Sequence, residues 1–189
     1  MATRNEHKLR ELGEVLVGFE LEPLLDEVEL PPEDGATFAD NALIKARAAH
    51  AATGRAAIAD DSGIEARALG GAPGVRSARF AGPGASNEEN LAVLLRELAG
   101  VDDRRVAYVC ALAYVADDGG EHLVEGRCEG TFASAPRGSG GFGYDPAFVP
   151  DDTGPDDPRT MAELSADEKH AISHRGRAAR ALAELLSRR

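Results

Sequence analysis

The chain has 189 residues, with 33 acidic and 21 basic side chains and a formal net charge of −12 at pH 7. This length predicts a single domain, residues 1–189, with a substantial core. The acidic balance argues against nucleic acid polymers as partners, because binding them needs many basic side chains. No apolar run approaches the roughly 20 residues of a membrane-spanning helix, the first residues lack the apolar core of a secretory signal, and two cysteines are too few for a disulfide scaffold. We therefore expect a cytoplasmic protein that does not associate with membranes.

Helices and strands alternate along the first half of the sequence. Apolar residues spaced three and four apart indicate helices, and short apolar runs between turn residues indicate strands. Thr37 followed by Asp40, like Ser86 followed by Glu89, is typical of a capping box at a helix start. In chain order, we expect a helix at 5–17, a strand at 19–25, a helix at 37–53, strands at 56–59 and 64–69, and a helix at 86–98.

The clearest strand signal lies in the second half of the chain. Residues 105–116 and 121–132 flank a DDGG turn and predict an antiparallel hairpin. A short helical segment at 165–170 and an amphipathic helix at 174–186 follow. The intermixed elements predict an α/β fold, an elongated mixed β-sheet flanked by helices. We expect two lobes, with the hairpin at about 104–133 in the smaller or extended lobe, and a central cleft that binds the ligand.

Two adjacent acids, Asp60 and Asp61, follow the strand expected at 56–59. Ligands collect at strand ends in α/β proteins, and adjacent carboxylates suit a hard cation such as Mg²⁺. The same dipeptide, followed by Ser62 and Gly, is also typical of a charged turn. Asp40 lies on the helix that leads into this strand, so its carboxylate could face the same strand end as well as cap its own helix.

Only three of the 21 basic side chains are lysines, and the others are arginines. All three lysines lie in segments that could bind phosphate. Lys8 follows Thr3 and Asn5 at an expected helix start, where free N–H groups and the helix dipole attract phosphate. Lys45 shares a helix with Asp40, and Lys169 precedes a basic SHR segment. A compact ammonium group suits phosphate oxygens, although the lysines could also be remnants of an arginine-rich composition. The pattern favours a Mg²⁺-dependent enzyme that acts on a nucleotide.

Two later segments carry residues that suit a nucleobase. Phe142 and Tyr144 flank Gly143 in a glycine-rich stretch and could stack on a base, and Asp145 could accept a hydrogen bond from a ring N–H. A flexible loop anchored by two aromatic residues would have the same composition.

The second of these segments places three cationic or protonatable groups close together. Lys169, His174 and Arg175 lie within seven residues near a helix start. They suit a polyphosphate or a purine carbonyl. A solvated helix face would also carry them.

Six segments match one family, in order and at fitting spacing: T-x-N-x-x-K at 3–8, TFADNALIKA at 37–46, ADDSG at 59–63, LGGAPGVRSARFAG at 69–82, GGFGYDP at 140–146 and ELSADEKHAISHRGRA at 163–178. Over nearly its whole length, the chain resembles the inosine/xanthosine triphosphate pyrophosphatases, which cleanse the nucleotide pool of deaminated purines. The resemblance implies an inosine triphosphatase-like fold with a central nucleotide cleft, and a homodimer. It also implies Mg²⁺-dependent hydrolysis of XTP, ITP and dITP to the nucleoside monophosphate and pyrophosphate.

The resemblance also implies roles for individual residues. Asp61 would be the general base that activates water, and the metal carboxylates would be Asp40, Asp60 and Asp61. The phosphates would be bound by Thr3, Arg4, Asn5, Glu6, His7, Lys8, Lys45 and Ser62. The base would be held by Phe142, Gly143, Tyr144, Asp145, Lys169, His174 and Arg175.

These assignments agree with the chemistry of the reaction. Phosphoanhydride hydrolysis needs charge neutralisation and a positioned water molecule more than it needs a covalent intermediate. A keto group at purine C6 accepts hydrogen bonds where the amino group of adenine donates them. Donors such as Lys169, His174 and Arg175 would therefore favour keto bases.

The chain departs from the family pattern at three places. Arg4 stands where the family often has Gly, and Asp40 stands where it often has Glu. Members usually begin with a short apolar strand, whereas Met1 and Ala2 alone precede the first motif. We expect the natural start to lie upstream of this Met1.

Two other functions remain open at this stage. A related enzyme could act on modified pyrimidines, dTTP or UTP, and base preference would distinguish it. A catalytically inactive module could bind nucleotides without turnover, although Asp40, Lys45, Asp60 and Asp61 argue against it. A purely structural role would leave the concentration of lysines and glycines in the motifs unexplained.

Overall fold

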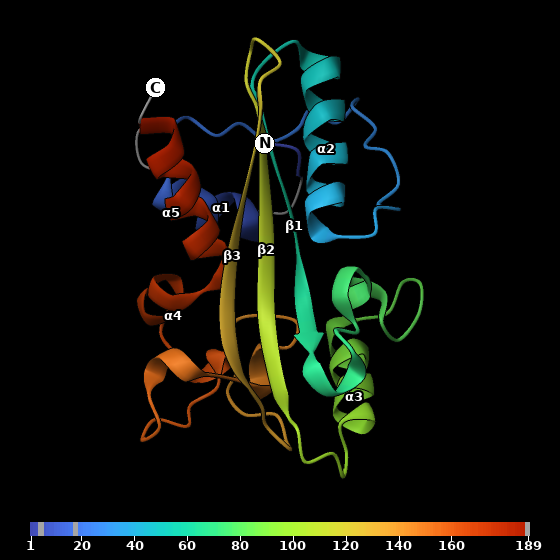
Figure 1. Ribbon diagram of the computed structural model, residues 1–189, viewed down its shortest axis with the longest axis vertical. Coiled ribbons are helices and arrows are strands. Elements are labelled where there is room, and N and C mark those ends of the chain that lie inside the picture. Colours follow the sequence, from blue (N-terminus) through green and yellow to red (C-terminus); the bar gives the residue numbers. More distant parts are fainter. Residues whose placement is uncertain (4–5, 17–18, 188–189) are drawn as a thin grey trace. The chain divides into compact units, whose positions relative to one another are not determined.

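The structure, a computed structural model, describes residues 1–3, 6–16 and 19–187. It confirms the predicted α/β class (Figure 1). One four-stranded sheet has its strands in chain order, and β3 pairs with β4 in antiparallel orientation. The strands are β1 (Ala57–Ala66), β2 (Arg105–Val115), β3 (Glu121–Phe132) and β4 (Phe148–Pro150), and the helices are α1 (Glu6–Val15), α2 (Phe38–Thr53), α3 (Asn87–Glu97), α4 (Ala166–Ile172) and α5 (His174–Ser187). No helix in the described ranges is long and apolar enough to cross a membrane.

The chain divides into two compact units, and β1, β2 and β3 each contribute residues to both. Unit 1 comprises Met1–Ser62, Cys110–Gly126 and His174–Arg189. Unit 2 comprises Gly63–Val109 and Arg127–Ser173. Each unit has a hydrophobic core of its own.

Unit 1 is built around helix α1, which packs on α5. Leu12 of α1 and Leu16, the residue that follows this helix, are fully buried against Leu182 of α5. The sheet contributes Ile58 and Leu112 to the same core. Leu16 N donates to the carbonyl oxygen of Leu12 at 2.8 Å, so the spacing of four residues keeps the two leucines on the same side, as the apolar pattern predicts.

Unit 2 has a core rich in aromatic side chains. The ring of Tyr108 in β2 stacks on Phe148 of β4, with 4.4 Å between the ring centroids. Phe132 of β3 is fully buried in the same cluster, which Leu94 of α3 completes. Stacked aromatic pairs add stability beyond their buried area.

Two sequence predictions of strands are wrong. The strands expected at 56–59 and 64–69 form one continuous strand, β1, which passes through the aspartates without a turn. A Cβ atom on Gly63 would lie 2.8 Å from the carbonyl oxygen of Gly74, so this residue allows the strand to pass close to a neighbouring segment. The strand expected at 19–25 is absent from the described structure. Phe19 and Leu25 remain exposed, so the alternating pattern there does not mark a buried strand face.

The guanidinium group of Arg104 ties the ends of two elements in unit 2 together. It donates hydrogen bonds to the carbonyl oxygens of Leu98, Phe132 and Ala133, at 2.7, 2.6 and 2.8 Å. Leu98 follows α3, Phe132 ends β3 and Ala133 follows β3. One side chain therefore satisfies three carbonyl groups at the ends of two elements.

We expect Arg104→Lys to lower the free energy of unfolding by about 1–3 kcal/mol, because an ammonium group cannot reach all three carbonyl groups. Arg67→Lys is the control, since Arg67 makes an exposed ion pair with Asp103 and such pairs contribute little. Urea denaturation at pH 7 measures both variants. Equal losses for the two variants would contradict the assigned role of Arg104.

Candidate functional site

Asp60 and Asp61 lie in the interior of β1, and both are buried, with 2% and 8% of their surface exposed. Successive side chains of a strand point to opposite faces of the sheet. The two carboxylates accordingly have different neighbours. Ser62 shares a face with Asp60, two residues away.

The face that carries Asp60 receives cations from α1 and α5. Lys8 Nζ lies 2.9 Å from Asp60 Oδ2, and Arg175 Nε lies 3.6 Å from the same oxygen. Burial alone would raise the pKa of Asp60, but these two cations outweigh it and lower the pKa to about 2. Arg175 also donates from Nη2 to Ser62 Oγ at 3.1 Å. Asp60 is therefore held as an anion.

The face that carries Asp61 receives side chains from α2. Asn41 Nδ2 donates to Asp61 Oδ2 at 3.0 Å, and Lys45 Nζ lies 3.6 Å from Asp61 Oδ1. Burial raises the pKa of Asp61, and Lys45 and Asn41 offset this only in part. Of the two adjacent carboxylates, Asp61 is thus the one that accepts a proton more readily.

Glu33 is a third carboxylate in this cluster, and it was not among the residues predicted from the sequence. Its Oε1 accepts a hydrogen bond from Lys45 Nζ at 2.6 Å. Burial lowers the pKa of Lys45, whereas Asp61 and Glu33 raise it, and the net shift is upward. Lys45 is therefore held in its charged ammonium form between the carboxylates of Asp61 and Glu33.

Asp40 has the capping role that its position predicts. Its Oδ2 accepts from the backbone N and the Oγ1 of Thr37, at 3.1 and 2.8 Å. In the described ranges, no group of three or more His, Cys, Asp or Glu side chains is arranged to hold a metal ion. The metal roles of Asp40, Asp60 and Asp61 stay predictions.

The oxygen atoms of Asp60 and Asp61 are nevertheless suitable ligands for Mg²⁺. Asp60 Oδ1 is buried and accepts no hydrogen bond from any residue that the structure describes. Asp61 Oδ1 faces Lys45 at 3.6 Å, longer than a hydrogen bond. Carboxylate oxygens of this kind are the donors that Mg²⁺ prefers.

Several predicted phosphate-binding residues are at or beyond the limits of the described structure. Arg4 and Asn5 lie outside the described residues, as do the side chains of Glu6 and His7. Thr3 is half-buried, and its carbonyl oxygen accepts from Leu24 N at 3.4 Å. Their assigned roles stay predictions.

Of the residues assigned to the base, two lie in unit 1. His174 and Arg175 begin α5 and are buried there, and Arg175 reaches Asp60 and Ser62. The structure therefore brings Arg175 together with residues assigned to the metal and the phosphates. Lys169, by contrast, belongs to unit 2.

Unit 2 gathers Lys169 and Phe142 around the carboxylate of Asp145. Asp145 Oδ2 accepts from Lys169 Nζ and from Phe142 N, both at 2.8 Å, and Oδ1 accepts from Tyr108 OH at 3.1 Å. Lys169 Nζ also lies 5.0 Å from the centroid of the Phe142 ring. Asp145 thus fixes both neighbours. Tyr108, which was not among the residues predicted from the sequence, supports it.

Phe142 rather than Tyr144 presents its ring to solvent. Phe142 is 39% exposed, whereas Tyr144 is 6% exposed and belongs to the core of unit 2. Tyr144 OH donates to the carbonyl oxygen of Ser77 at 2.7 Å. Gly143, between them, has a positive φ of 62° that favours glycine. Phe142 is therefore the aromatic residue available for stacking.

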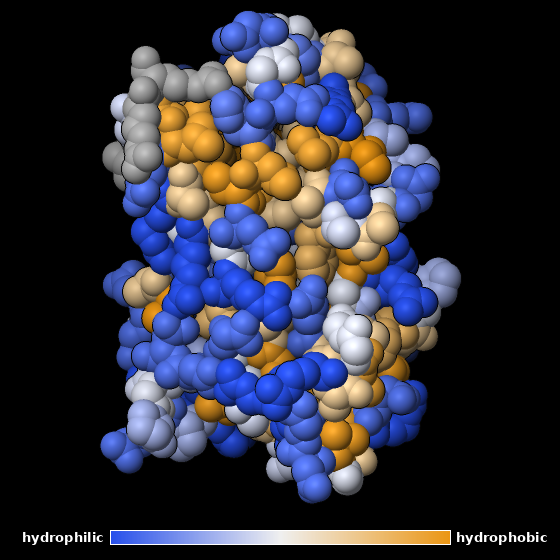
Figure 2. Space-filling view, in the orientation of Figure 1, coloured by the Kyte–Doolittle hydropathy of each residue, from blue (hydrophilic) through white to orange (hydrophobic). Residues whose placement is uncertain are grey.

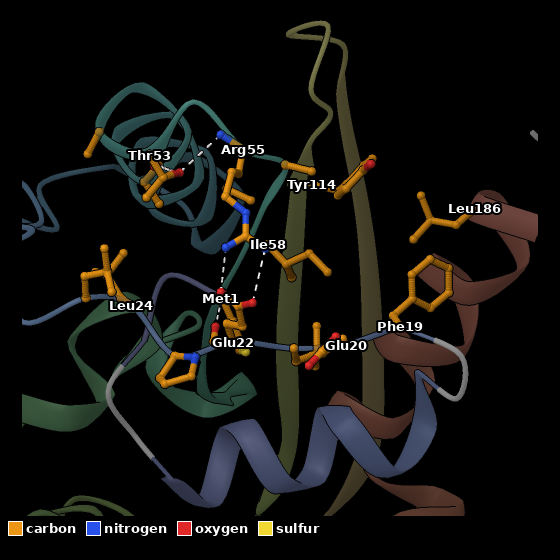
Figure 3. Close-up of a pocket in the computed structure, with 17 residues that line it drawn as sticks. Met1, Phe19, Glu20, Glu22, Leu24, Thr53, Arg55, Ile58, Tyr114 and Leu186 are labelled. Carbon is orange, nitrogen blue, oxygen red and sulfur yellow. Dashed lines mark hydrogen bonds and ion pairs between the residues drawn. The ribbon is translucent and has the colours of Figure 1, made fainter.

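A separate hollow of about 420 Å³, lined by both apolar and charged side chains, lies in unit 1 (Figure 3). Met1, Leu24, Ile58, Tyr114 and Leu186 are among its lining residues. Figure 2 shows apolar side chains gathered in the upper part of the visible face. None of the candidate residues lines this hollow, so it is distinct from the charged cluster.

Comparison with known proteins identifies relatives along nearly the whole chain. The sequence model of the Ham1 family matches residues 1–185. A dITP/XTP pyrophosphatase of Exiguobacterium sp. is 48% identical over 186 residues, which cover 96% of this chain and 93% of that protein. A dITP/XTP pyrophosphatase of Mycobacterium bovis is 52% identical over 187 residues, which cover 94% and 89%. The structure of a HAM1 protein from Coxiella burnetii is 40% identical, with a TM-score of 0.89 over 99% of this chain and 96% of that chain.

The low pKa of Asp60 predicts a specific loss of stability in acid. Its folded pKa of about 2 lies below the value of about 3.9 for an unfolded chain, so its contribution is present above about pH 4 and is lost as the pH falls toward 2. We expect the free energy of unfolding of the wild type to fall more steeply over this range than that of Asp60→Asn. Urea denaturation at several pH values measures both slopes, and parallel slopes would contradict the ionised state of Asp60.

Proposed function

Because the chain belongs to the Ham1 family, we propose that it is a nucleoside-triphosphate pyrophosphatase that hydrolyses XTP, ITP and dITP to the monophosphate and pyrophosphate. The relatives named dITP/XTP pyrophosphatase support this substrate class. The proposal includes Mg²⁺ as cofactor, a homodimer, and action in the cytoplasm on the nucleotide pool. The carboxylate oxygens described above support Mg²⁺, and the family resemblance supports the homodimer and the action on the nucleotide pool.

The observation that carries the proposal is the charge-balanced cluster around β1. Three carboxylates, Asp60, Asp61 and Glu33, contact three cations, Lys8, Lys45 and Arg175. A cluster of this kind can exchange its partners: the cations can bind phosphate oxygens while the carboxylates bind a metal. Phosphoanhydride hydrolysis requires both abilities.

In the proposed reaction, the two adjacent carboxylates have different tasks. Asp61, whose pKa is raised by burial, takes the proton of the attacking water. Asp60 stays ionised beside Lys8 and Arg175, so its negative charge does not change during the reaction. Lys8 and Lys45 bind the phosphate oxygens and stabilise the charge on the leaving pyrophosphate.

Asp40, Asp60 and Asp61 are the residues that we propose to hold Mg²⁺. When bound, Mg²⁺ would supply Lewis-acid polarisation of the phosphoryl oxygens. Asp40 caps α2 through Thr37, so its carboxylate would exchange a hydrogen-bond role for a metal contact.

Unit 2 supplies the proposed base recognition. Phe142 offers an exposed ring on which a purine can stack, and Lys169 offers N–H donors to a keto oxygen. Asp145 fixes both residues, so their donors and ring face are set before the ligand arrives. A base that presents an amino group in place of the keto oxygen offers Lys169 a donor where the keto oxygen offers an acceptor, which disfavours adenine.

The test is a substrate panel with a matched variant. The purified protein receives ITP, XTP, dITP, ATP, GTP and dTTP with Mg²⁺, and pyrophosphate and orthophosphate are measured separately. We expect pyrophosphate from ITP, XTP and dITP and little from ATP and dTTP. We also expect little from GTP, whose base shares the keto group at C6 but carries a 2-amino group that the site must reject separately. Asp61→Asn should lower the rate by about 10²–10⁴-fold, because the general base is lost while the side chain keeps its size.

Three results would contradict the proposal. Pyrophosphate released chiefly from dTTP would indicate a pyrimidine enzyme. Nucleotide binding without turnover would indicate a binding module. Near-normal turnover by Asp61→Asn would remove Asp61 from the mechanism.

A further inference from the structure

We infer that Asn41 is a positioning residue that sets the orientation of the Asp61 carboxylate, an inference that rests on the proposed function of Asp61. Asn41 lies one residue after Asp40 in the first turns of α2 and has none of its surface exposed. Asn41 carries no charge, and it is not among the residues to which the sequence motifs assign a role.

Asn41 uses both ends of its amide group. Its Nδ2 donates to Asp61 Oδ2 at 3.0 Å, and its Oδ1 accepts from Gly35 N at 2.8 Å. The two bonds fix the amide plane from opposite ends, so the N–H aimed at Asp61 cannot rotate away. A carboxylate held by a fixed donor has one preferred orientation for its other oxygen.

The second bond of Asn41 also controls the neighbour of the other Asp61 oxygen. Gly35 lies two residues after Glu33, whose carboxylate holds Lys45 Nζ at 2.6 Å. Lys45 Nζ in turn lies 3.6 Å from Asp61 Oδ1. A Cβ atom on Gly35 would lie 2.7 Å from Asn41 Oδ1, so the loop and the amide are in close contact. Asn41 therefore contacts Asp61 Oδ2 directly. It also holds the loop whose Glu33 binds Lys45, the cation that faces Asp61 Oδ1.

A second asparagine in the same local structure separates this role from ordinary helix packing. Asn90 follows the capping box of α3, as Asn41 follows that of α2. Asn90 is also buried, and its Oδ1 accepts from the backbone N of a preceding residue, Ala81, at 2.8 Å. Its Nδ2, however, donates to the carbonyl oxygen of Ala78 at 3.2 Å. Both residues pin a loop to a helix start, but the N–H of Asn41 reaches a carboxylate.

The first experiment compares Asn41→Asp with Asn90→Asp. Each change keeps an oxygen for the loop N–H and replaces the donating NH₂ group. We expect Asn41→Asp to lower kcat for ITP by about 10- to 100-fold with little change in KM, because Asp61 loses its fixed orientation. Asn90→Asp should leave kcat unchanged even where its melting temperature falls.

The neutral pair Asn41→Ala and Asn90→Ala tests whether added charge is the cause. We expect Asn41→Ala to lose kcat as well, and Asn90→Ala to keep it. Equal effects of the two positions on kcat would overturn the positioning role of Asn41.

A second measurement tests the contact without any turnover. Asn41→Asp should lower the melting temperature, because it places two carboxylates side by side, and the added change Asp61→Asn should restore much of that loss by reversing donor and acceptor. If the double variant Asn41→Asp/Asp61→Asn were no more stable than Asn41→Asp, the assigned contact between Asn41 and Asp61 would be contradicted. A wild-type protein that releases no pyrophosphate would overturn the proposed function instead.

Discussion

Two adjacent carboxylates in the interior of a buried strand are the constraint on which the structure of unit 1 depends. A buried carboxylate without a partner is strongly destabilising, so each of these groups needs its own neutralising contacts. Strand geometry sends Asp60 and Asp61 to opposite faces of β1, which separates the two problems. Helices α1 and α5 bring Lys8 and Arg175 to Asp60, and α2 brings Lys45 and Asn41 to Asp61.

The unequal surroundings give the two carboxylates different acidities. Asp60 faces two cations and has a pKa of about 2, whereas burial raises the pKa of Asp61 beside one cation and one neutral donor. Neighbouring acids whose environments move their pKa values apart are suited to different tasks in one reaction. The proposed mechanism uses this difference: a constant negative charge at Asp60 and proton transfer at Asp61.

Much of the fold was predictable because its signals are local. The capping box at Thr37 and Asp40 marks the start of α2, and the apolar run at 105–116 followed by the DDGG turn marks the hairpin of β2 and β3. The continuity of β1 was not predictable, because ADDSG has the composition of a turn and its neutralising partners lie far away in sequence, at residues 8, 45 and 175. The contacts of Glu33 and Asn41 also arise from a loop and a helix that meet in three dimensions, so residue type alone does not indicate them.

The most direct test of this division of roles is an NMR titration of the side-chain carboxyl carbons of Asp60 and Asp61 in the wild-type protein. We expect Asp60 to stay ionised until about pH 2 and Asp61 to take up its proton at a higher pH than an ordinary aspartate. If Asp61 instead titrated at or below the pH at which Asp60 does, the two carboxylates would not have the separate roles assigned to them.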